Sequence, residues 1–159
     1  MTQTSDHQST MTTDALDDGP ILVVDDDDSL RELCSRVLMA QGHEVHTASL
    51  AEEALALAAQ NNYRVVLLDL KMPGMDGIEC LRRLKAQGCR ADIVMITGYG
   101  NVPTAVEAMK VGARDFIEKP FRPDDLHAML QDILARQRQT ISEDPIVAFI
   151  QTNATEIGS

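Results

Sequence analysis

Three short, continuous runs of apolar residues constrain the fold of this chain more than any other feature. The runs lie within residues 21–24, 64–69 and 92–97, and a stretch with helical spacing of apolar residues follows each of them. A strand that is covered on both faces needs apolar side chains on both, so such runs are typical of buried parallel strands. Two further strands are predicted at the edges of the same sheet, one over the alternating residues 44–49 and a shorter one over 114–119.

The alternation of strands with helices predicts the fold class. Successive strands begin about 20–28 residues apart, which is the length of one strand–helix unit. Five such units predict an α/β protein with a parallel five-stranded sheet and helices on both faces. With the continuous apolar strands in the centre, the strand order is 2-1-3-4-5, the flavodoxin-like doubly wound (βα)5 arrangement. Ligands of such sheets bind at the carboxyl ends of the strands, where the winding reverses between the first and third strands.

Details of two helices are also predicted. Ser49, with Glu52 three residues later, predicts a capping box at the start of a helix over residues 50–60. A second helix opens at Pro103, and its spacing predicts one shared apolar face made of Val102, Ala105, Val106 and Met109.

Composition divides the chain into three parts. Residues 1–19 are rich in Thr, Ser, Gln and Asp and predict a disordered N-terminal tail. Residues 20–137 contain all the predicted strands and helices and form one domain. Residues 138–159 are too few for an output domain, so we interpret them as a linker or as the start of an output or partner-binding segment.

Charge and apolar content exclude several classes of protein. The net charge is −11, and residues 1–30 carry eight Asp and no Lys or Arg, which leaves −3 for the rest. An acidic surface of this kind does not attract nucleic acid on its own. The longest apolar runs have five or six residues, which predicts no membrane segment. Three cysteines without CxxC spacing predict free thiols, no zinc site and a cytoplasmic protein.

The carboxyl ends of the predicted strands collect three acids, a hydroxyl and an ammonium group. The first strand ends at Asp25 and Asp26, the third at Asp69, the fourth at Thr97 and the fifth at Lys119. Three close carboxylates repel one another unless a proton or a cation intervenes. A site with few carboxylate ligands and several retained waters suits Mg²⁺. Zinc is a poor fit because no His or Cys belongs to this group of strand-end residues.

The same residues point to phosphoryl chemistry. Mg²⁺ and the Lys119 ammonium would neutralise phosphoryl oxygens, and the Thr97 hydroxyl would donate to one of them. Neither GxGxxG nor GxxxxGK follows a predicted strand, so the sequence offers no glycine loop for a nucleotide. The remaining hypothesis is a phosphoryl group carried covalently on an Asp carboxylate, for which Asp69 on a central strand is the candidate.

Four motifs in order then resemble the response-regulator receiver domain of two-component signalling. They are VVDDD (23–27), VVLLDLKMPGMDG (65–77), VMITGYG (94–100) and ARDFIEKPF (113–121), and the resemblance covers about residues 20–136. It implies a Mg²⁺ site made by Asp25, Asp26, Asp69 and the main-chain carbonyl of Lys71, with Asp27 and Asp28 opening the first helix. It also implies roles at four positions: phosphoacceptor Asp69, switch residues Thr97 and Phe116, and phosphate-pairing Lys119 before a cis proline, Pro120.

The resemblance implies a phosphorylation-dependent signalling switch with a transcriptional or partner output, in which DNA is contacted only through an output domain not present in this chain. A sensor histidine kinase or phosphotransfer protein would be its phosphodonor, and its only catalysis would be its own phosphotransfer and autodephosphorylation. Phosphorylation would change the face made by the fourth helix, fifth strand and fifth helix and favour a homodimer through it.

Two alternative functions are less consistent with the sequence. An aspartyl-phosphate phosphatase would need a second Asp at position 71, where the sequence has Lys71. A receiver that never accepts phosphate would lack Asp69, an acid partner or Lys119, and all three are present.

Overall fold

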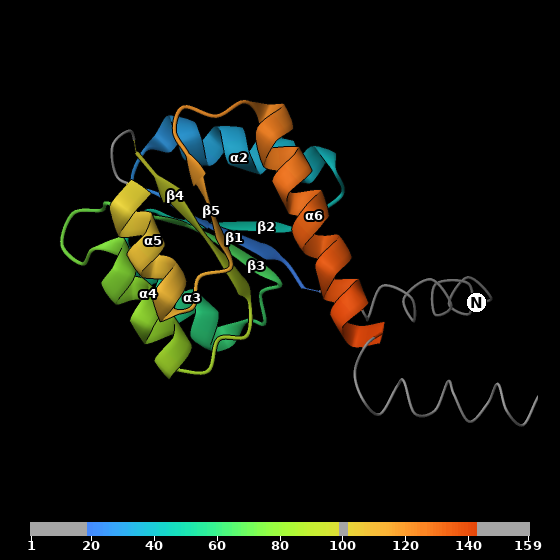
Figure 1. Cartoon of the computed structure of the whole chain (residues 1–159). Helices are drawn as coiled ribbons and strands as arrows, with labels where there is room; N and C mark the ends of the chain where they lie inside the picture. Colours follow the sequence, from blue (N-terminus) through green and yellow to red (C-terminus); the bar gives the residue numbers. More distant parts are fainter. Residues whose placement is uncertain (1–18, 99–101, 143–159) are drawn as a thin grey trace, which may run out of the picture. The chain divides into compact units, whose positions relative to one another are not determined.

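The computed structural model describes residues 19–98 and 102–142, in which five strands alternate with five helices (Figure 1). The elements are β1 (Ile21–Val24), α2 (Asp28–Ala40), β2 (Val45–Ala48), α3 (Ala51–Gln60), β3 (Val65–Asp69), α4 (Gly77–Ala86), β4 (Asp92–Thr97), α5 (Val102–Val111), β5 (Asp115–Glu118) and α6 (Pro123–Ser142).

All five strands are parallel and form one sheet in the order β2-β1-β3-β4-β5. Ile21 of β1 pairs with Val45 of β2 on one side and with Val65 of β3 on the other. The predicted doubly wound fold is therefore confirmed. The reversal of winding falls between β1 and β3, where the sequence predicts a ligand site.

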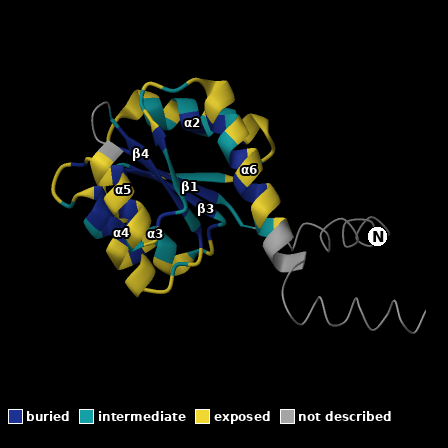
Figure 2. Ribbon diagram, viewed as in Figure 1, coloured by how far each residue is buried: buried dark blue, intermediate teal, exposed yellow. Residues whose placement is uncertain are grey.

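The central strands are buried on both faces, as their continuous apolar sequences predict (Figure 2). Leu22 and Val24 of β1 belong to a large apolar cluster with residues of α3, α4 and α5. Their neighbours Ile21 and Val23, which point to the other face, are also fully buried. The core therefore lies on both sides of the sheet and holds the strand ends in fixed positions.

Helix α5 buries a different face from the one that its sequence predicts. Ala105 is buried as expected, but its buried partner is Ala108, while Val106 and Met109 are 46% and 37% exposed. The prediction for Val106 and Met109 is wrong because the small alanine side chains, and not the larger apolar ones, are the residues that α5 buries. The side chain of Val102 lies outside the described residues.

The predicted capping box of α3 is also wrong. The helix begins at Ala51 after the N-cap residue Leu50, whose side chain makes no capping hydrogen bond. The main-chain N–H of Ser49 donates to Oε1 of Glu53 at 2.9 Å, so the glutamate one position further along reaches back. The start of the helix lies one residue beyond the expected position, which moves Ser49 out of the capping position.

Residues 19–127 form one compact unit, and the rest of α6 is described by itself. The helix carries four buried residues at helical spacing, Leu126, Leu130, Ile133 and Leu134. It runs past the expected domain boundary at residue 137 and ends at Ser142. Most of the predicted tail (1–19) and terminal segment (138–159) lies outside the described residues. Within the described part of the chain, no helix is long and apolar enough to cross a membrane.

Candidate functional site

The structure brings three of the predicted acids together at the carboxyl ends of β1 and β3. Val24 pairs with Leu68, so the residues that follow them, Asp25 and Asp69, lie side by side. Each of these two and Asp26 offers a carboxylate oxygen, and these oxygens all lie within 4.8 Å of one another. Asp25 is fully buried and Asp69 is 3% exposed, while Asp26 is exposed to solvent.

Burial and charge repulsion dominate the electrostatics of this cluster. Burial, and then the neighbouring charge of Asp25, raise the pKa of Asp69 from 3.8 to about 7. The ammonium of Lys119 opposes this rise, with its Nζ 3.4 Å from Oδ2 of Asp25 and 3.7 Å from Oδ1 of Asp69. Among the described residues, the buried Oδ2 of Asp25 accepts no hydrogen bond. The site therefore carries more negative charge than its lysine balances.

The donor set of the cluster fits a hard divalent cation. Asp25, Asp26 and Asp69 supply only carboxylate oxygens, and the buried Oδ2 of Asp25 is available to a ligand. The exposed side at Asp26 leaves room for retained waters. Mg²⁺ prefers oxygen ligands and keeps several waters, so these three residues are the ones that would hold it.

The four consecutive aspartates divide into two pairs. Asp27 is the N-cap of α2, and its Oδ1 accepts from the main-chain N–H groups of Ser29 and Leu30 at 2.9 and 3.2 Å. The N–H of Asp27 in turn donates to Oδ1 of Asp25 at 2.8 Å, which orients that carboxylate. Asp28 is the first residue of α2. The expectation that the second pair opens the first helix is therefore confirmed.

Thr97 and Lys119 lie next to each other across β4 and β5. The main-chain N–H of Lys119 donates to the carbonyl of Thr97 at 2.7 Å. Thr97 is fully buried, and its hydroxyl donates to the carbonyl of Gly98 at 3.3 Å. The peptide bond between Lys119 and Pro120 is cis, as the resemblance implies. The structure thus brings Lys119 to the acids and places Thr97 at the neighbouring strand end.

Lys71 and Phe116 occupy the remaining predicted positions. The main-chain N–H of Lys71 donates to Oδ1 of Asp69 at 3.2 Å, while its side chain is exposed. The role of the Lys71 carbonyl as a metal ligand stays a prediction. Phe116 on β5 pairs with Met95, is half-buried, and packs against the apolar cluster on the face of α3, α4 and α5.

The loop after β3 returns very close to the strand that it leaves. A Cβ atom placed on Gly77 would lie 2.4 Å from the carbonyl oxygen of Asp69 and 2.7 Å from Cα of Leu70. The N–H of Gly77 donates to the carbonyl of Leu70 at 2.9 Å. A glycine at the start of α4 is thus what allows the helix to approach the main chain of Asp69.

Arg31 contacts the acidic turn, although no motif in the sequence singles this residue out. Its Nη1 donates to the main-chain carbonyl of Asp25 at 2.7 Å, and its Nη2 pairs with Oδ1 of Asp28. The only signal in the sequence is the spacing of Asp28 and Arg31, three residues apart on a helix, which predicts a side-chain pair. The contact with Asp25 depends on the path of the turn and has no signal of that kind.

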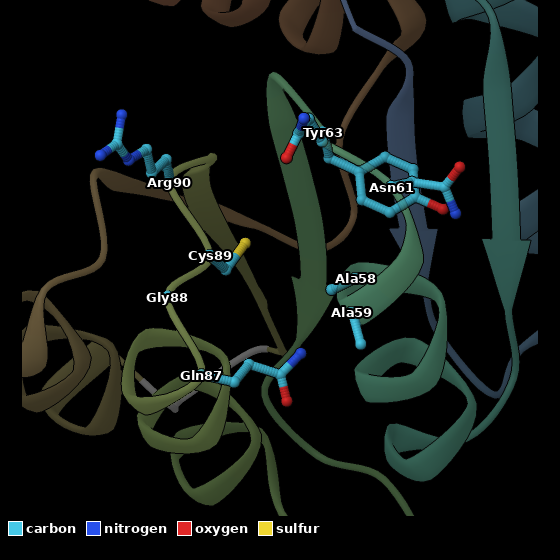
Figure 3. A pocket seen from close by; sticks show the side chains of 9 residues that line it. Ala58, Ala59, Asn61, Tyr63, Gln87, Gly88, Cys89 and Arg90 are labelled. Carbon is cyan, nitrogen blue, oxygen red and sulfur yellow. The ribbon is translucent and has the colours of Figure 1, made fainter.

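A separate cavity of about 430 Å³ lies at the opposite ends of the strands, between the segments that lead into β3 and β4 (Figure 3). Asn61, Gln87, Cys89 and Arg90 are among the residues that line it. The amide of Gln87 donates to the carbonyl of Leu55 at 3.0 Å and so links α4 to α3. None of the predicted site residues lines this cavity.

A parallel sheet of this order, with acids and a lysine at the carboxyl ends of its strands, is the CheY-like fold of signalling domains. The sequence model of the family described as "Response regulator receiver domain" matches residues 21–131. The chain belongs to this receiver-domain family of two-component systems. Members are signalling domains and not conventional enzymes; in general they bind Mg²⁺ and take phosphoryl groups from histidine kinases.

The chain is similar to two regulatory proteins, one of which is a transcriptional regulator. Over 130 residues the chain is 42% identical to the transcriptional regulatory protein FixJ of Bradyrhizobium diazoefficiens, covering 82% of this chain and 63% of FixJ. Over 117 residues it is 41% identical to the regulatory protein AtoC of Escherichia coli, covering 74% of this chain and 25% of AtoC. The chain therefore spans less than two thirds of the length of these curated relatives.

Solved structures agree with the fold. The receiver domain of NtrX from Brucella abortus matches with a TM-score of 0.69 and 43% identity, covering 72% of this chain and 98% of that one. The chemotaxis protein CheY4 of Vibrio cholerae matches with a TM-score of 0.66 and 35% identity, covering 72% of this chain and 97% of that one.

Proposed function

We propose that this chain is a phosphorylation-dependent switch in which Asp69 accepts a phosphoryl group with the help of Mg²⁺. The phosphodonor is the phosphohistidine of a sensor histidine kinase or of a phosphotransfer protein. Asp25, Asp26, Asp69 and the Lys71 carbonyl hold the metal. The observation that carries the proposal is the cluster of three carboxylates with Lys119 against two of them.

The chemistry follows from the position of Asp69. One carboxylate oxygen forms a bond to phosphorus while the bond from phosphorus to the histidine nitrogen breaks, and the leaving imidazole takes a proton from water. When bound, Mg²⁺ neutralises phosphoryl oxygens and favours the ionised form of Asp69. Lys119 is near enough to pair with the new phosphoryl group from another side, at 3.7 Å from Oδ1 of Asp69.

The signal leaves the site through Thr97 and Phe116. An acyl phosphate adds about −1.5 to −2 charges, toward which the Thr97 hydroxyl turns. The space that Thr97 vacates lets Phe116 turn inward and alters the face of α5, β5 and the start of α6. Val106, which is 46% exposed on α5, supplies apolar surface there, and Lys110 and Asp115 are available for reciprocal charge pairs. We propose a two-fold homodimer through this face upon phosphorylation.

The output of the switch is transcriptional or acts on a partner protein. The relatives FixJ and AtoC are regulatory proteins longer than this chain, which supports an output domain as the route to DNA. Within the chain we propose residues 20–137 as the receiver, 1–19 as a tail, and 138–159 as a linker or the start of the output segment.

Labelling with a small phosphodonor in the presence of Mg²⁺ tests the phosphoacceptor. The wild-type chain should gain one acid-stable, base-labile phosphoryl group, detected by intact mass and by hydroxylamine cleavage. Asp69→Asn should gain none, because the nucleophile is absent. Glu107→Gln, an exposed acid on α5, is the matched control and should label normally. Full labelling of Asp69→Asn would show that Asp69 is not the phosphoacceptor.

Sedimentation at tens of micromolar tests the dimer separately. Beryllium fluoride with Mg²⁺ imitates the phosphoryl group and should shift the wild-type chain toward a dimer. Thr97→Ala should bind the mimic and remain monomeric, because the site is then uncoupled from the face. A wild-type chain that binds the mimic, as followed by NMR, and stays monomeric would refute the dimer and leave the phosphoacceptor untouched.

A further inference from the structure

Arg31 joins the two ends of the acidic turn between β1 and α2. One arm of its guanidinium, Nη1, donates to the main-chain carbonyl of Asp25 at 2.7 Å. The other arm, Nη2, pairs with the carboxylate of Asp28, the first residue of α2. The Arg31 side chain is only 20% exposed, whereas that of Asp28 is 89% exposed. The guanidinium of this largely buried side chain thus spans the turn that carries Asp25 and Asp26.

A second hydrogen bond lies within the turn. The N–H of Asp27 donates to Oδ1 of Asp25 at 2.8 Å, and Asp27 also caps α2. Asp27 therefore contacts both the helix, which its side chain caps, and the buried carboxylate of Asp25, to which its N–H donates. Arg31 holds the main chain of Asp25 toward the same helix, so both contacts fix where the Asp25 carboxylate lies relative to Asp69.

We propose that Arg31 is a positioning residue for the Mg²⁺ site, which it serves by linking the main chain of Asp25 to the side chain of Asp28 at the start of α2. The inference rests on the proposed metal site at Asp25, Asp26 and Asp69. Arg31 does not touch the metal in this role. It lowers the freedom of the loop that presents two of the three carboxylates, so the ligands do not have to be ordered when the ion binds.

Simple electrostatics predicts the opposite effect of removing Arg31. A positive charge on the turn repels Mg²⁺, so neutralising it would strengthen metal binding if charge alone mattered. If positioning dominates, the same change weakens binding. The sign of the change in affinity therefore separates the two explanations. Arg31→Lys adds a second test, because lysine keeps the charge but has no planar fork to reach two acceptors at once.

Titration of Mg²⁺ into the wild-type chain and its variants measures the effect. The chain has no tryptophan, so we would follow binding by calorimetry and by amide NMR shifts at about 0.1 M salt. Arg31→Gln should bind Mg²⁺ about tenfold more weakly than the wild type, which is at the low end for residues that orient metal ligands. Arg31→Lys should lose nearly as much.

Arg36→Gln is the matched control. Arg36 lies on the same helix and pairs with Glu32 at 2.9 Å, but both side chains are exposed. Its Mg²⁺ affinity should stay within about twofold of the wild type, and any change should be toward tighter binding. In the absence of Mg²⁺, the Asp27 amide should exchange with solvent faster in Arg31→Gln than in Arg36→Gln, which shows directly that the turn has loosened.

Three outcomes would overturn the inference. If Arg31→Gln bound Mg²⁺ as tightly as the wild type or more tightly, charge and not position would govern. If Arg31→Lys bound like the wild type, the two-armed contact would be unnecessary. If the wild-type chain itself bound no Mg²⁺, the proposed metal site would fail and this inference with it, a result distinct from failure of the variants alone.

Discussion

The two ends of the strands differ in the polar groups that lie there. At the carboxyl ends, Asp25 and Asp69 are buried side by side, and the pKa of Asp69 is raised to about 7. At the amino ends, two neutral amides donate to main-chain carbonyls of α3: Asn61 donates to Leu57 and Gln87 donates to Leu55. Among the described residues, the close cluster of buried carboxylates therefore lies at the end where we propose metal binding. Receivers with such a rim gain a site at a cost in stability.

The largest expected difference between the two ends concerns thiol reactivity. Burial, and then the charge of Asp25, raise the pKa of Cys34 to about 12, while Cys89 is half-exposed beside the cavity at the amino ends. Iodoacetamide at pH 8 should modify Cys89 on the order of 10³ times faster than Cys34, which reacts only when the fold opens. Peptide mass spectrometry over time measures both rates.

The third cysteine is the control for this experiment. Cys80 is buried, and burial, and then the charge of Glu52, raise its pKa to about 12 as well. It should be as slow as Cys34, and all three should react fully in urea. Equal rates for Cys34 and Cys89 in the folded chain would show that the carboxyl end opens far more readily than its burial indicates.

Glycine substitutions give the next largest difference. Gly77→Ala places a Cβ 2.4 Å from the carbonyl of Asp69 and should lower the free energy of unfolding by about 3 kcal/mol. Gly88→Ala, near the cavity, meets no heavy atom within 4 Å and carries only the cost of its positive φ of 90°, about 1 kcal/mol. Urea unfolding of both variants checks this, and equal losses would contradict the close approach at Gly77.

The repulsion itself should be visible in the pH dependence of stability without Mg²⁺. The pKa of folded Asp69, about 7, lies above its ordinary value of 3.8. Stability from the protonated form is therefore complete below the unfolded pKa and is lost as pH rises through about 7. In EDTA at pH 8, Asp69→Asn should be more stable than the wild type by about 2 kcal/mol, and this gain should shrink toward pH 5.

Chemical denaturation at pH 5 and pH 8 measures that difference. Glu107→Gln removes an exposed acid from α5 and should match the wild type within about 0.5 kcal/mol at both values. A wild type and Asp69→Asn of equal stability at pH 8 would mean that Lys119 alone balances the buried carboxylates.

The smallest effect expected is stabilisation by Mg²⁺. An ion that binds only the folded state adds about 1 kcal/mol when its concentration is a few times its dissociation constant, or roughly 3–6 °C in the melting temperature. Asp26→Asn should show a smaller shift, because it removes the exposed ligand. Gly88→Ala, altered at the opposite end, should keep the full shift. A melting temperature that Mg²⁺ leaves unchanged in the wild type, as in Asp26→Asn, would count against the site.

The sheet could be predicted from the sequence because each central strand repeats one local signal, an apolar run covered on both faces. The order β2-β1-β3-β4-β5 then follows from which strands lack that signal. The acids could be placed together because parallel strands end at one edge. These inferences depend on strand direction and on burial, and both can be predicted from short segments of sequence.

Other features depend on distances between segments and could not be predicted. The buried face of α5 was misassigned, because hydropathy favours Val106 and Met109 over Ala108, whereas the buried positions are the small ones. Arg31 was missed because its contact with Asp25 spans six residues and depends on the path of the turn. The cap of α3 was misplaced by one residue, because a helix start is decided by hydrogen bonds such as that of Ser49 to Glu53.

The run of four aspartates has a consequence for inheritance. Deleting any one of the four codons would give the same protein with three aspartates. The same variant would therefore disturb both the proposed metal ligands and the start of α2. It would also draw Arg31 one residue closer to Val24, and one residue is about 100° of helix rotation and 1.5 Å of rise. The guanidinium would then face away from the carbonyl that it now holds. In this stretch the number of residues matters as well as their identity, because the spacing places Arg31 at the carbonyl of Asp25.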